Sequence, residues 1–335
     1  MSKTPSLFAG DCELFVDGGD EPLYEIHADT LTVLCMGGGQ DSAYLAFRLV
    51  EEPKFKERFI GCGRLICMFA DTGCEKPETY EYLRDVIRPL LAKGGIPFYW
   101  IRPEMGYHSE GCETLWNYID RYETIPSVAY GKRSSTCSFR VKQDVINRAI
   151  EHWLSKEYQV PYGRKRGFKK YFSLYGKVRV MLGIAHGEES RVQGKEWKEK
   201  WKRVCLEHVY PLIEEKIDRD IIHSDMAKNG WVMPMPSACE ICHWTASGSN
   251  LVRVYKKRRQ VWDRWVAAEK RKLDNCSNLN ETRKNFGVVG RWHKDENRPF
   301  TLEDALAEVL PEYDHLSIAE LDAIAMQGHA VKSCY

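Results

Sequence analysis

The chain reads Leu31-Thr-Val-Leu-Cys-Met36, then Gly37-Gly-Gly-Gln-Asp-Ser42, then Ala43-Tyr-Leu-Ala-Phe-Arg-Leu-Val50. The first six residues are mostly apolar and partly β-branched, a pattern that predicts a short buried strand. The last eight are apolar at the positions of a helix that packs on a sheet. Three glycines between a strand and a helix predict a turn that presents free backbone N–H groups and the positive end of the helix dipole. Such a turn is typical of a phosphate site, although a glycine-rich turn without a ligand has the same pattern.

The spacing of the glycines excludes two common phosphate loops. A Walker loop requires Gly-x-x-x-x-Gly-Lys-Ser/Thr, and a dinucleotide loop requires Gly-x-Gly-x-x-Gly. Position 42 is Ser, and no Lys follows the glycines. The segment resembles the Ser-Gly-Gly-x-Asp-Ser loop of the PP-loop ATP pyrophosphatases, with Gly37 in place of the first Ser. This resemblance implies that residues 37–42 bind the pyrophosphate of ATP and that the reaction breaks the bond between the α- and β-phosphates.

A second apolar run, Arg64-Leu-Ile-Cys-Met-Phe-Ala70, predicts another buried strand of the parallel type. It delivers Asp71-Thr-Gly-Cys-Glu-Lys-Pro-Glu-Thr79 to the carboxyl end of the sheet, where ligands bind in open α/β folds. This segment resembles the Asp-Thr-Gly-x-x-x-Pro-Glu-Thr segment of the phosphoadenosine-phosphosulfate-reductase-like branch of the PP-loop proteins. Pro and Glu at a helix start are also ordinary capping residues. The resemblance implies that Asp71, Thr72 and Gly73 lie beside the nucleotide.

Two further segments resemble the same branch. Cys137 and Lys142 match its Cys-Thr-x-x-x-Lys segment, although Lys142 would also suit an exposed helix position. A strand predicted over 178–185 precedes His186-Gly-Glu-Glu-Ser-Arg191, which resembles a Gly-Ile-Arg-x-x-Glu-Ser-x-Arg segment with Ala185 where Arg is common. The resemblance implies catalytic roles for Asp41, Ser42, Lys142 and Arg191, the last two as balance for phosphate charge. It implies a nucleotide-binding set of Gly37, Gly38, Gly39, Gln40, Asp41, Ser42, Asp71, Thr72, Gly73, Glu189 and Arg191, with Asp41 fixing the loop or a Mg²⁺ ion.

Twelve cysteines without a secretory signal favour thiols and metal ligands over disulfides. Cys239 and Cys242 form a Cys-x-x-Cys, which by itself suits a redox dithiol, half of a zinc site or half of an iron–sulfur site. In the resembling family a cysteine near the lysine segment and a later Cys-x-x-Cys hold a [4Fe–4S] cluster in some members, and Cys137, Cys239 and Cys242 match these positions. The fourth ligand would be Cys205, Cys276, a non-cysteine group or a substrate sulfur. A structural zinc site and free thiols are the alternatives.

The predicted fold class is α/β, a doubly wound and mostly parallel sheet with a helical C-terminal extension. We expect an N-terminal extension over 1–30, a PP-loop domain over 31–250 and a basic helical region over 251–335. Within the domain the periodicity predicts a helix over 78–93, a strand over 97–101, helix within 104–127, a flexible loop over 160–177, a closing strand over 210–213 and a helix over 217–229. A basic amphipathic helix is expected over 251–272, loop over 275–300, and two helices over 300–309 and 317–327 with Thr301 and Ser317 as N-caps.

Charge is unevenly distributed although the net charge is only +1. Residues 1–130 carry 12 Lys and Arg against 21 Asp and Glu, whereas residues 131–210 carry 19 against 8. Basic residues interleaved with aromatic ones over 162–172 and 255–262 suit a polyanionic partner, or else solvated charged faces. No apolar run approaches the ~20 residues of a membrane span. We expect a cytoplasmic protein with no membrane partner.

Three functions compete. The first is sulfur insertion into nucleic acid after adenylylation by ATP, for which the nearest resemblance is the PP-loop component of bacterial DNA phosphorothioation systems. That resemblance implies DNA, a cysteine desulfurase as sulfur donor and other modification subunits as partners, with a tRNA thiolase as a variant and a homodimer left open. The second is reduction of phosphoadenosine or adenosine phosphosulfate, which uses a nucleophilic cysteine on a C-terminal tail, where this chain has the lone Cys334. The third is a nucleotide-binding regulatory subunit without catalysis.

Overall fold

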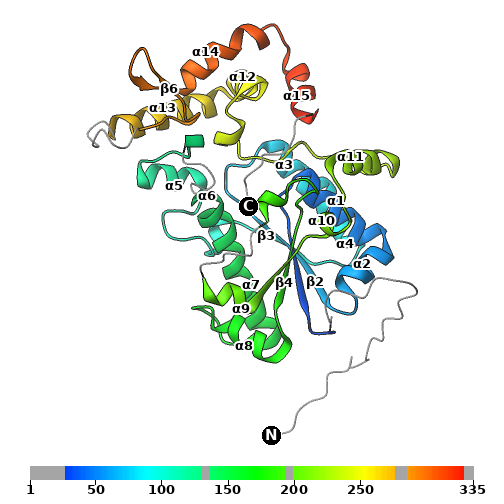
Figure 1. The fold of residues 1–335 in the computed structure, drawn as a ribbon. Helices are drawn as coiled ribbons and strands as arrows, with labels where there is room; N and C mark the ends of the chain where they lie inside the picture. Colours follow the sequence, from blue (N-terminus) through cyan, green and yellow to red (C-terminus); the bar gives the residue numbers. More distant parts are fainter. Residues whose placement is uncertain (1–26, 130–135, 193–198, 276–284, 328–335) are drawn as a thin grey trace, which may run out of the picture.

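A computed structural model describes residues 27–129, 136–192, 199–275 and 285–327 of the chain (Figure 1). Its centre is one sheet of five parallel strands in the order β3-β2-β1-β4-β5. Their bounds are β1 Leu31–Cys35, β2 Arg64–Ala70, β3 Phe98–Ile101, β4 Val178–Leu182 and β5 Leu206–Val209. Val33 pairs with Ile66 on one side and Val180 on the other, so β1 is the middle strand. The glycine loop leaves the carboxyl end of this central strand.

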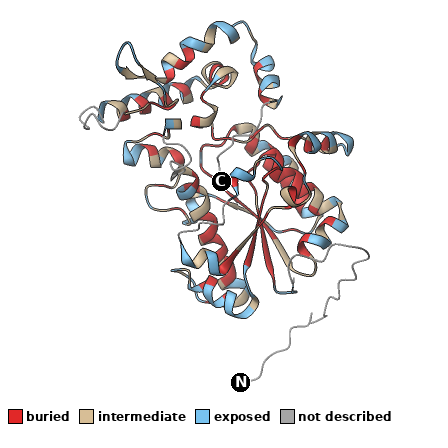
Figure 2. Cartoon of the chain, in the orientation of Figure 1, coloured by how far each residue is buried: buried red, intermediate tan, exposed pale blue. Residues whose placement is uncertain are grey.

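Helices cover both faces of the sheet, which confirms the doubly wound α/β class. Leu34 points to one face and Val33 to the other, because successive side chains of a strand alternate. The Leu34 face is covered by α1 Gln40–Glu51, α2 Pro53–Ile60, the continuous run of α3 Pro77–Tyr82, η1 Leu83–Ile87 and α4 Arg88–Lys93, and by α10 Pro211–Glu214 and α11 Arg219–Lys228. The Val33 face is covered by α7 Asp144–Tyr158, α8 Arg166–Tyr175 and α9 Lys200–Cys205. Figure 2 shows the strands as the most buried part of the fold.

The C-terminal helices form a third core that reaches back to the sheet domain. They are α12 Gly248–Lys257, α13 Arg259–Asn275, α14 Leu302–Tyr313 and α15 Ile318–Gln327, and they gather at one end of the molecule in Figure 1. Trp265 and Leu302 pack in one apolar cluster with Ile119 of α5 (Leu115–Tyr122) and with Cys239 and Cys242. Arg253 of α12 also donates to Glu78 at the start of α3, at 2.6 Å. The last helices therefore support the segment that carries the Cys-x-x-Cys.

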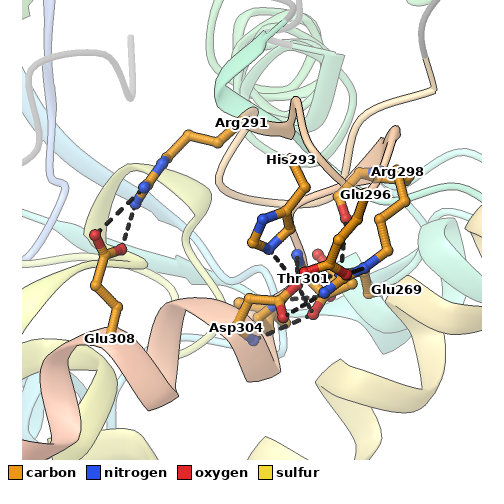
Figure 3. A network of polar contacts seen from close by, with 10 residues as sticks. Glu269, Arg291, His293, Glu296, Arg298, Thr301, Asp304 and Glu308 are labelled. Carbon is orange, nitrogen blue, oxygen red and sulfur yellow. Dashed lines mark hydrogen bonds and ion pairs between the residues drawn. The ribbon is translucent and has the colours of Figure 1, made fainter.

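A polar network fixes the start of α14 (Figure 3). Thr301 and Asp304 form a capping box, in which each side chain accepts from the other residue's backbone N–H. Arg298 of the hairpin β6 Trp292–His293 and β7 Arg298–Pro299 makes a two-pronged pair with Asp304. Glu269 of α13 accepts the N–H of Leu302 at 2.7 Å. Thr301 is thus confirmed as an N-cap, and Ser317 likewise accepts the N–H of Glu320 at 3.3 Å.

The prediction of a closing strand over 210–213 is wrong, because the strand lies just before these residues. The strand is β5, and residues 210–213 turn into α10, with Pro211 at the first helical position. Pro lacks an N–H and suits that position, where the N–H would have no helical acceptor. Leu206 and Val209 are the residues that bury against β4.

The predicted flexible loop over 160–177 is also wrong, because most of it is α8. Phe168 and Tyr171 are fully buried at helical spacing, while Lys169 and Lys170 between them are exposed. The Tyr171 hydroxyl donates to the carbonyl of Asp29 at 2.6 Å. The many basic residues of this segment led to the loop prediction, although its apolar residues have the spacing of an amphipathic helix.

The remaining predictions hold less uniformly. The single helix predicted over 251–272 is two helices, α12 and α13, and the loop predicted over 275–300 contains the hairpin of β6 and β7. The extension predicted over 1–30 lies mostly outside the described residues. Helix within 104–127 is limited to α5 and the short η2 Pro103–Met105. The segment that carries Lys142 is α6 Thr136–Ser138 followed by η4 Phe139–Gln143, a π-helical turn that runs into α7. No helix in the described part of the chain has the length and apolar character needed to cross a membrane.

Candidate functional site

The glycine loop presents a row of backbone donors at the start of α1. The N–H of Gly37 donates to Ser42 Oγ at 3.2 Å, and Ser42 Oγ donates to the carbonyl of Gly39 at 3.1 Å. The first backbone bond of the helix runs from Ala43 N to Gly39 O. From Gly38 to Ser42 the N–H groups have no acceptor among the described residues. Five such donors at a helix N-terminus make an anion-binding site.

Neighbouring atoms leave no room for a side chain at the glycines of this loop. Gly38 has a φ of +70°, and a Cβ there would lie 2.5 Å from Thr79 Cγ2. A Cβ on Gly39 would lie 2.4 Å from Ser237 Oγ, and one on Gly183, just after β4, would lie 2.7 Å from the backbone nitrogen of Ser42. The loop is therefore held between α3, the segment before the Cys-x-x-Cys and the end of β4. Neither Ser237 nor Gly183 was foreseen from the sequence.

Asp41 belongs to a buried cluster of two carboxylates and two guanidinium groups. Its Oδ1 lies 3.4 Å from Arg219 Nε, and its Oδ2 lies 4.0 Å from Arg191 Nη1. Glu188 accepts a hydrogen bond from Arg191 Nη1, and its Oε1 forms an ion pair with Arg219 Nη2 at 2.9 Å. Burial raises the pKa of Asp41, and the charge of Arg219 opposes that rise. Both Asp41 oxygens thus face arginines, and a contact from Asp41 to Mg²⁺ stays a prediction.

Arg191 has one nitrogen, Nε, that is available to a ligand. It lies on η5 Glu189–Arg191 and is 8% exposed. Its Nε is buried and has no hydrogen-bond partner among the described residues. Arg219 and Glu188 were missed by sequence reasoning. Arg219 follows the N-cap Asp218 at the start of α11, and nothing in its local pattern distinguishes it from an ordinary helix residue.

Both carboxylate oxygens of Asp71 accept hydrogen bonds from neighbouring groups. Its Oδ1 accepts from Tyr80 Oη at 2.7 Å and from the N–H of Gly73 at 2.8 Å, and its Oδ2 accepts from Trp100 Nε1 at 2.9 Å. Thr72 Oγ1 donates to Glu75 Oε1 at 3.1 Å and lies 3.7 Å from Cys239 Sγ. The Asp-Thr-Gly turn therefore links β2 to the cysteine segment.

Two other predicted residues are also engaged locally. The Gln40 amide contacts His223 Nε2 at 3.1 Å and donates to the carbonyl of Pro234 at 3.4 Å. Glu189 is exposed and accepts from the N–H of Gly187 at 2.9 Å. Its neighbour Glu188 is the carboxylate that reaches the arginine cluster.

Lys142 lies where two cavities meet. Its Nζ is 2.9 Å from Glu75 Oε1, and that carboxylate oxygen is 3.7 Å from Cys239 Sγ. The first cavity, which we call the apolar cavity, is lined by Cys35, Lys142, Gln143, Ile146, Asn147, Ile150, Val180, Leu182, Ile184, Arg191, Lys202, Leu206 and His208. The second, the thiol cavity, is lined by Leu115, Pro126, Cys137, Ser138, Val141, Lys142, Cys239, Ile241, Cys242, His243 and Trp244.

The three predicted cluster cysteines all line the thiol cavity. Cys239 and Cys242 are buried and Cys137 is half-buried. Cys205 instead ends α9 and packs in the core on the Val33 face of the sheet, and Cys276 lies outside the described residues. Three thiols around one cavity are a donor set that fits an iron–sulfur cluster.

A single metal ion such as zinc requires a different arrangement of the same side chains. Within the described residues no group of three or more His, Cys, Asp or Glu side chains is arranged to hold a metal ion. A tetrahedral zinc site needs its donors within about 2.3 Å of one point. Ligands of a [4Fe–4S] cluster bind different irons and do not converge on one point. The iron–sulfur cluster and the zinc site therefore both stay predictions for these cysteines.

Comparisons with known proteins give distant structural likenesses. No protein-family model matches the chain, and no curated protein sequence matches it. A phosphoadenylyl-sulfate (PAPS) reductase from Candida auris, in a phosphate complex, is 14% identical, with 61% of this chain and 74% of that chain covered and a TM-score of 0.34. The U34-tRNA thiolase NcsA from Methanococcus maripaludis, with its [4Fe-4S] cluster, is 16% identical, with 86% and 74% covered and a TM-score of 0.36. At such scores the chemistry of this chain has to be argued from its own residues.

Proposed function

We propose that this chain is an ATP pyrophosphatase that activates an oxygen of a nucleic-acid acceptor, in the DNA backbone, for replacement by sulfur. The observation that carries the proposal is the position of Lys142, which lines both the apolar cavity and the thiol cavity. The apolar cavity borders Arg191, and the thiol cavity holds three cysteines. One cation therefore joins a candidate nucleotide site to a candidate sulfur site.

The first chemical step would use the glycine loop and the arginines. An acceptor oxygen attacks the α-phosphorus of ATP, a new P–O bond forms, and the bond to pyrophosphate breaks. The charge that develops on the leaving pyrophosphate is met by the free N–H groups from Gly38 to Ser42 and by Arg191 Nε. These donors are fixed before the reaction, so little reorganisation is needed when charge appears.

The second step would replace AMP. A hydrosulfide attacks the activated phosphorus, a P–S bond forms, and AMP departs with the original oxygen. The hydrosulfide is released by a thiol reductant from the persulfide of a cysteine desulfurase partner. Lys142 would balance its charge, and Glu75 holds the ammonium at 2.9 Å. A [4Fe–4S] cluster held by Cys137, Cys239 and Cys242 would supply an iron site for the sulfur to be transferred.

A basic surface supports a nucleic acid as the acceptor. Helices α8 and α9 pack through Phe168 and Trp201, whose rings are 5.0 Å apart. Their exposed cations are Arg166, Lys169, Lys170, Lys200 and Arg203. Lys202 of α9 lines the apolar cavity, so this surface adjoins the proposed nucleotide site. A basic surface of this kind binds phosphates without regard to sequence.

The test measures pyrophosphate release from ATP by the full chain with duplex DNA, with tRNA and with neither, in the presence of sulfide and desulfurase. The product nucleic acid is digested and its sulfur-containing nucleotides are identified by mass spectrometry. DNA-dependent release with phosphorothioate in the digest supports the proposal, and tRNA-dependent release with a thiolated base identifies the thiolase variant. Sulfite formed from phosphoadenosine or adenosine phosphosulfate, with no pyrophosphate from ATP, would overturn both.

A matched pair of variants tests the acceptor surface. Replacing Lys169 and Lys170 together with Ala should weaken nucleic-acid binding and reduce its dependence on salt, because fewer counterions are released. The same change in Lys54 and Arg58, exposed cations of α2 on the other face of the sheet, is the control. Equal weakening by both pairs would remove α8 as the acceptor surface.

A further inference from the structure

We infer that the acceptor nucleotide binds with its base out of the stack and laid against the ring of Phe139, so that the chain takes unpaired DNA in preference to paired DNA. The inference rests on the proposed function and specifies the state of its acceptor. It is carried by four residues that we call the aromatic strip, namely Tyr122, Phe139, Arg140 and Lys202.

The first argument is the exposure of two aromatic rings. Phe139 opens η4 and is 40% exposed, and Tyr122 ends α5 and is 46% exposed. Val141, two residues after Phe139, is by contrast buried in the wall of the thiol cavity. A ring face in contact with water can stack on any base, because every base has a π-face. Single exposed aromatic residues are common, so the surroundings of these two rings decide their meaning.

The second argument is the pairing of each ring with a cation. Lys202 Nζ lies 5.1 Å from the centre of the Phe139 ring, and the guanidinium of Arg140 lies 5.6 Å from the centre of the Tyr122 ring. A single strand alternates flat bases with charged phosphates, and rings interleaved with cations match both of its parts. An apolar partner would leave the two cations unused. The composition of the aromatic strip therefore fits a nucleic-acid strand.

The third argument is the place of Phe139 between the two cavities. Ser138, just before it, lines the thiol cavity, and Gln143, at the end of η4, lines the apolar cavity. Lys202 lines the apolar cavity as well, so the aromatic strip continues the basic surface of α8 and α9. A base that stacks on Phe139 would hold its own backbone beside the segment that carries Lys142.

This placement has a consequence for the state of the DNA. In a duplex both faces of a base are covered by the neighbouring base pairs, so no face is left for Phe139. A paired base must first leave the stack, which costs free energy that an unpaired base does not need. The aromatic strip should therefore favour a single strand, or a duplex in which the acceptor nucleotide is unpaired.

The experiment measures the Kd of the full-length protein by fluorescence anisotropy at one salt concentration. The probes are a labelled strand of about 20 nucleotides and the same strand annealed to its complement. Removing the ring in Phe139→Ala should weaken binding of the single strand by roughly 5- to 100-fold and change binding of the duplex by less than about twofold. Phe139→Trp keeps a ring at this position and should bind the single strand as the wild type does.

The matched control is Phe172→Ala. Phe172 lies on α8, is 38% exposed and is absent from the walls of both cavities. Its replacement should leave the affinity for both probes unchanged. Thermal unfolding by circular dichroism shows that each variant is folded. Equal losses for Phe139→Ala and Phe172→Ala, or equal affinity of the wild type for the two probes, would overturn the inference and leave the proposed function to its own test.

Two further outcomes separate this inference from the proposed function. Unchanged DNA binding together with loss of desulfurase binding in Phe139→Ala would overturn the inference and make the aromatic strip a protein contact. Binding of the single strand that depends on Phe139, without DNA-dependent release of pyrophosphate from ATP, would support the stacking surface and overturn the proposed function.

Discussion

The ammonium of Lys142 and the carboxylate of Glu75 form a buried pair at 2.9 Å, with the Glu75 side chain fully removed from solvent. The same carboxylate oxygen lies 3.7 Å from the sulfur of Cys239. Two motifs that are about 70 residues apart in the sequence are therefore joined by one ion pair. Each partner depends on the other, because an isolated buried charge is costly.

Replacing Lys142 with Met should lower both stability and activity. The buried Glu75 would lose its cation, at a cost of about 3–5 kcal/mol in the free energy of unfolding. Pyrophosphate release should fall by roughly 100-fold or more if Lys142 stabilises developing charge. The double variant Lys142→Met with Glu75→Gln should recover most of the stability in urea denaturation and none of the activity. Recovery of both would reduce Lys142 to a structural counter-ion.

Replacing Arg219 with Ala should be among the most destabilising single changes in the chain. It leaves Asp41 and Glu188 with Arg191 alone, in a cluster whose side chains are all at most 15% exposed. The expected loss is about 3–5 kcal/mol in the free energy of unfolding. The control is Arg259→Ala, since Arg259 and Asp263 form a pair that is more than half exposed and is worth about 0–1 kcal/mol. Similar losses for the two variants would contradict the buried cluster.

Replacing Gly39 with Ala should disturb the anion site through Ser237. The new methyl group would lie 2.4 Å from Ser237 Oγ, closer than Cβ contacts ordinarily allow. We expect a rise in the KM for ATP, because the row of N–H donors is pushed out of line. The double variant Gly39→Ala with Ser237→Gly removes the clash and should restore the KM. Steady-state kinetics of pyrophosphate release decide the matter, and a double variant as impaired as the single one would show that the glycine is needed for another reason.

Glu269 should make stability depend on pH. Burial raises its pKa from the ordinary 4.5 to about 7, although the N–H groups of Leu302 and Val288 and the charge of Lys272 oppose the rise. Between these two values the folded chain binds a proton that the unfolded chain releases, so this contribution is fully present below pH 4.5 and is lost as the pH rises to about 7. The loss is of order 3 kcal/mol. The urea midpoint of the wild type should therefore fall with rising pH across this window, whereas that of Glu269→Gln should fall less. Plots of midpoint against pH that run parallel for the two proteins would refute the shifted pKa.

The sheet was predictable because its signal is local. The strands that became β1, β2, β3 and β4 are short apolar runs bounded by glycine, proline or charge, and each was located to within three residues. β5 was displaced because Leu206-Glu-His-Val209 is half polar, whereas the neighbouring Tyr-Pro-Leu-Ile looks more apolar. Burial of both ends against β4 decided its conformation, and that is a tertiary effect.

The site was predictable only as far as its motifs extend. The glycine loop, Arg191 and the three cysteines could be named because each belongs to a recognisable spacing. Arg219 and Ser237 reach the loop from segments about 180 and 200 residues away, and no local pattern marks them. Asp71 shows the opposite case: the motif identifies the residue, but only the packing of Tyr80 and Trp100 reveals that its carboxylate is already occupied.

The π-helical turn at 139–143 has a consequence for the helical phase of the lysine segment. A π turn holds one residue more than an α turn, so Cys137 before it and the whole of α7 after it are rotated by about 100° relative to an unbroken helix. Deleting the single residue Arg140 would convert the turn to regular helix and swing Cys137 off the wall it shares with Cys239. The inserted residue of the π turn therefore sets the angle at which the wall of the thiol cavity is turned relative to the wall of the apolar cavity.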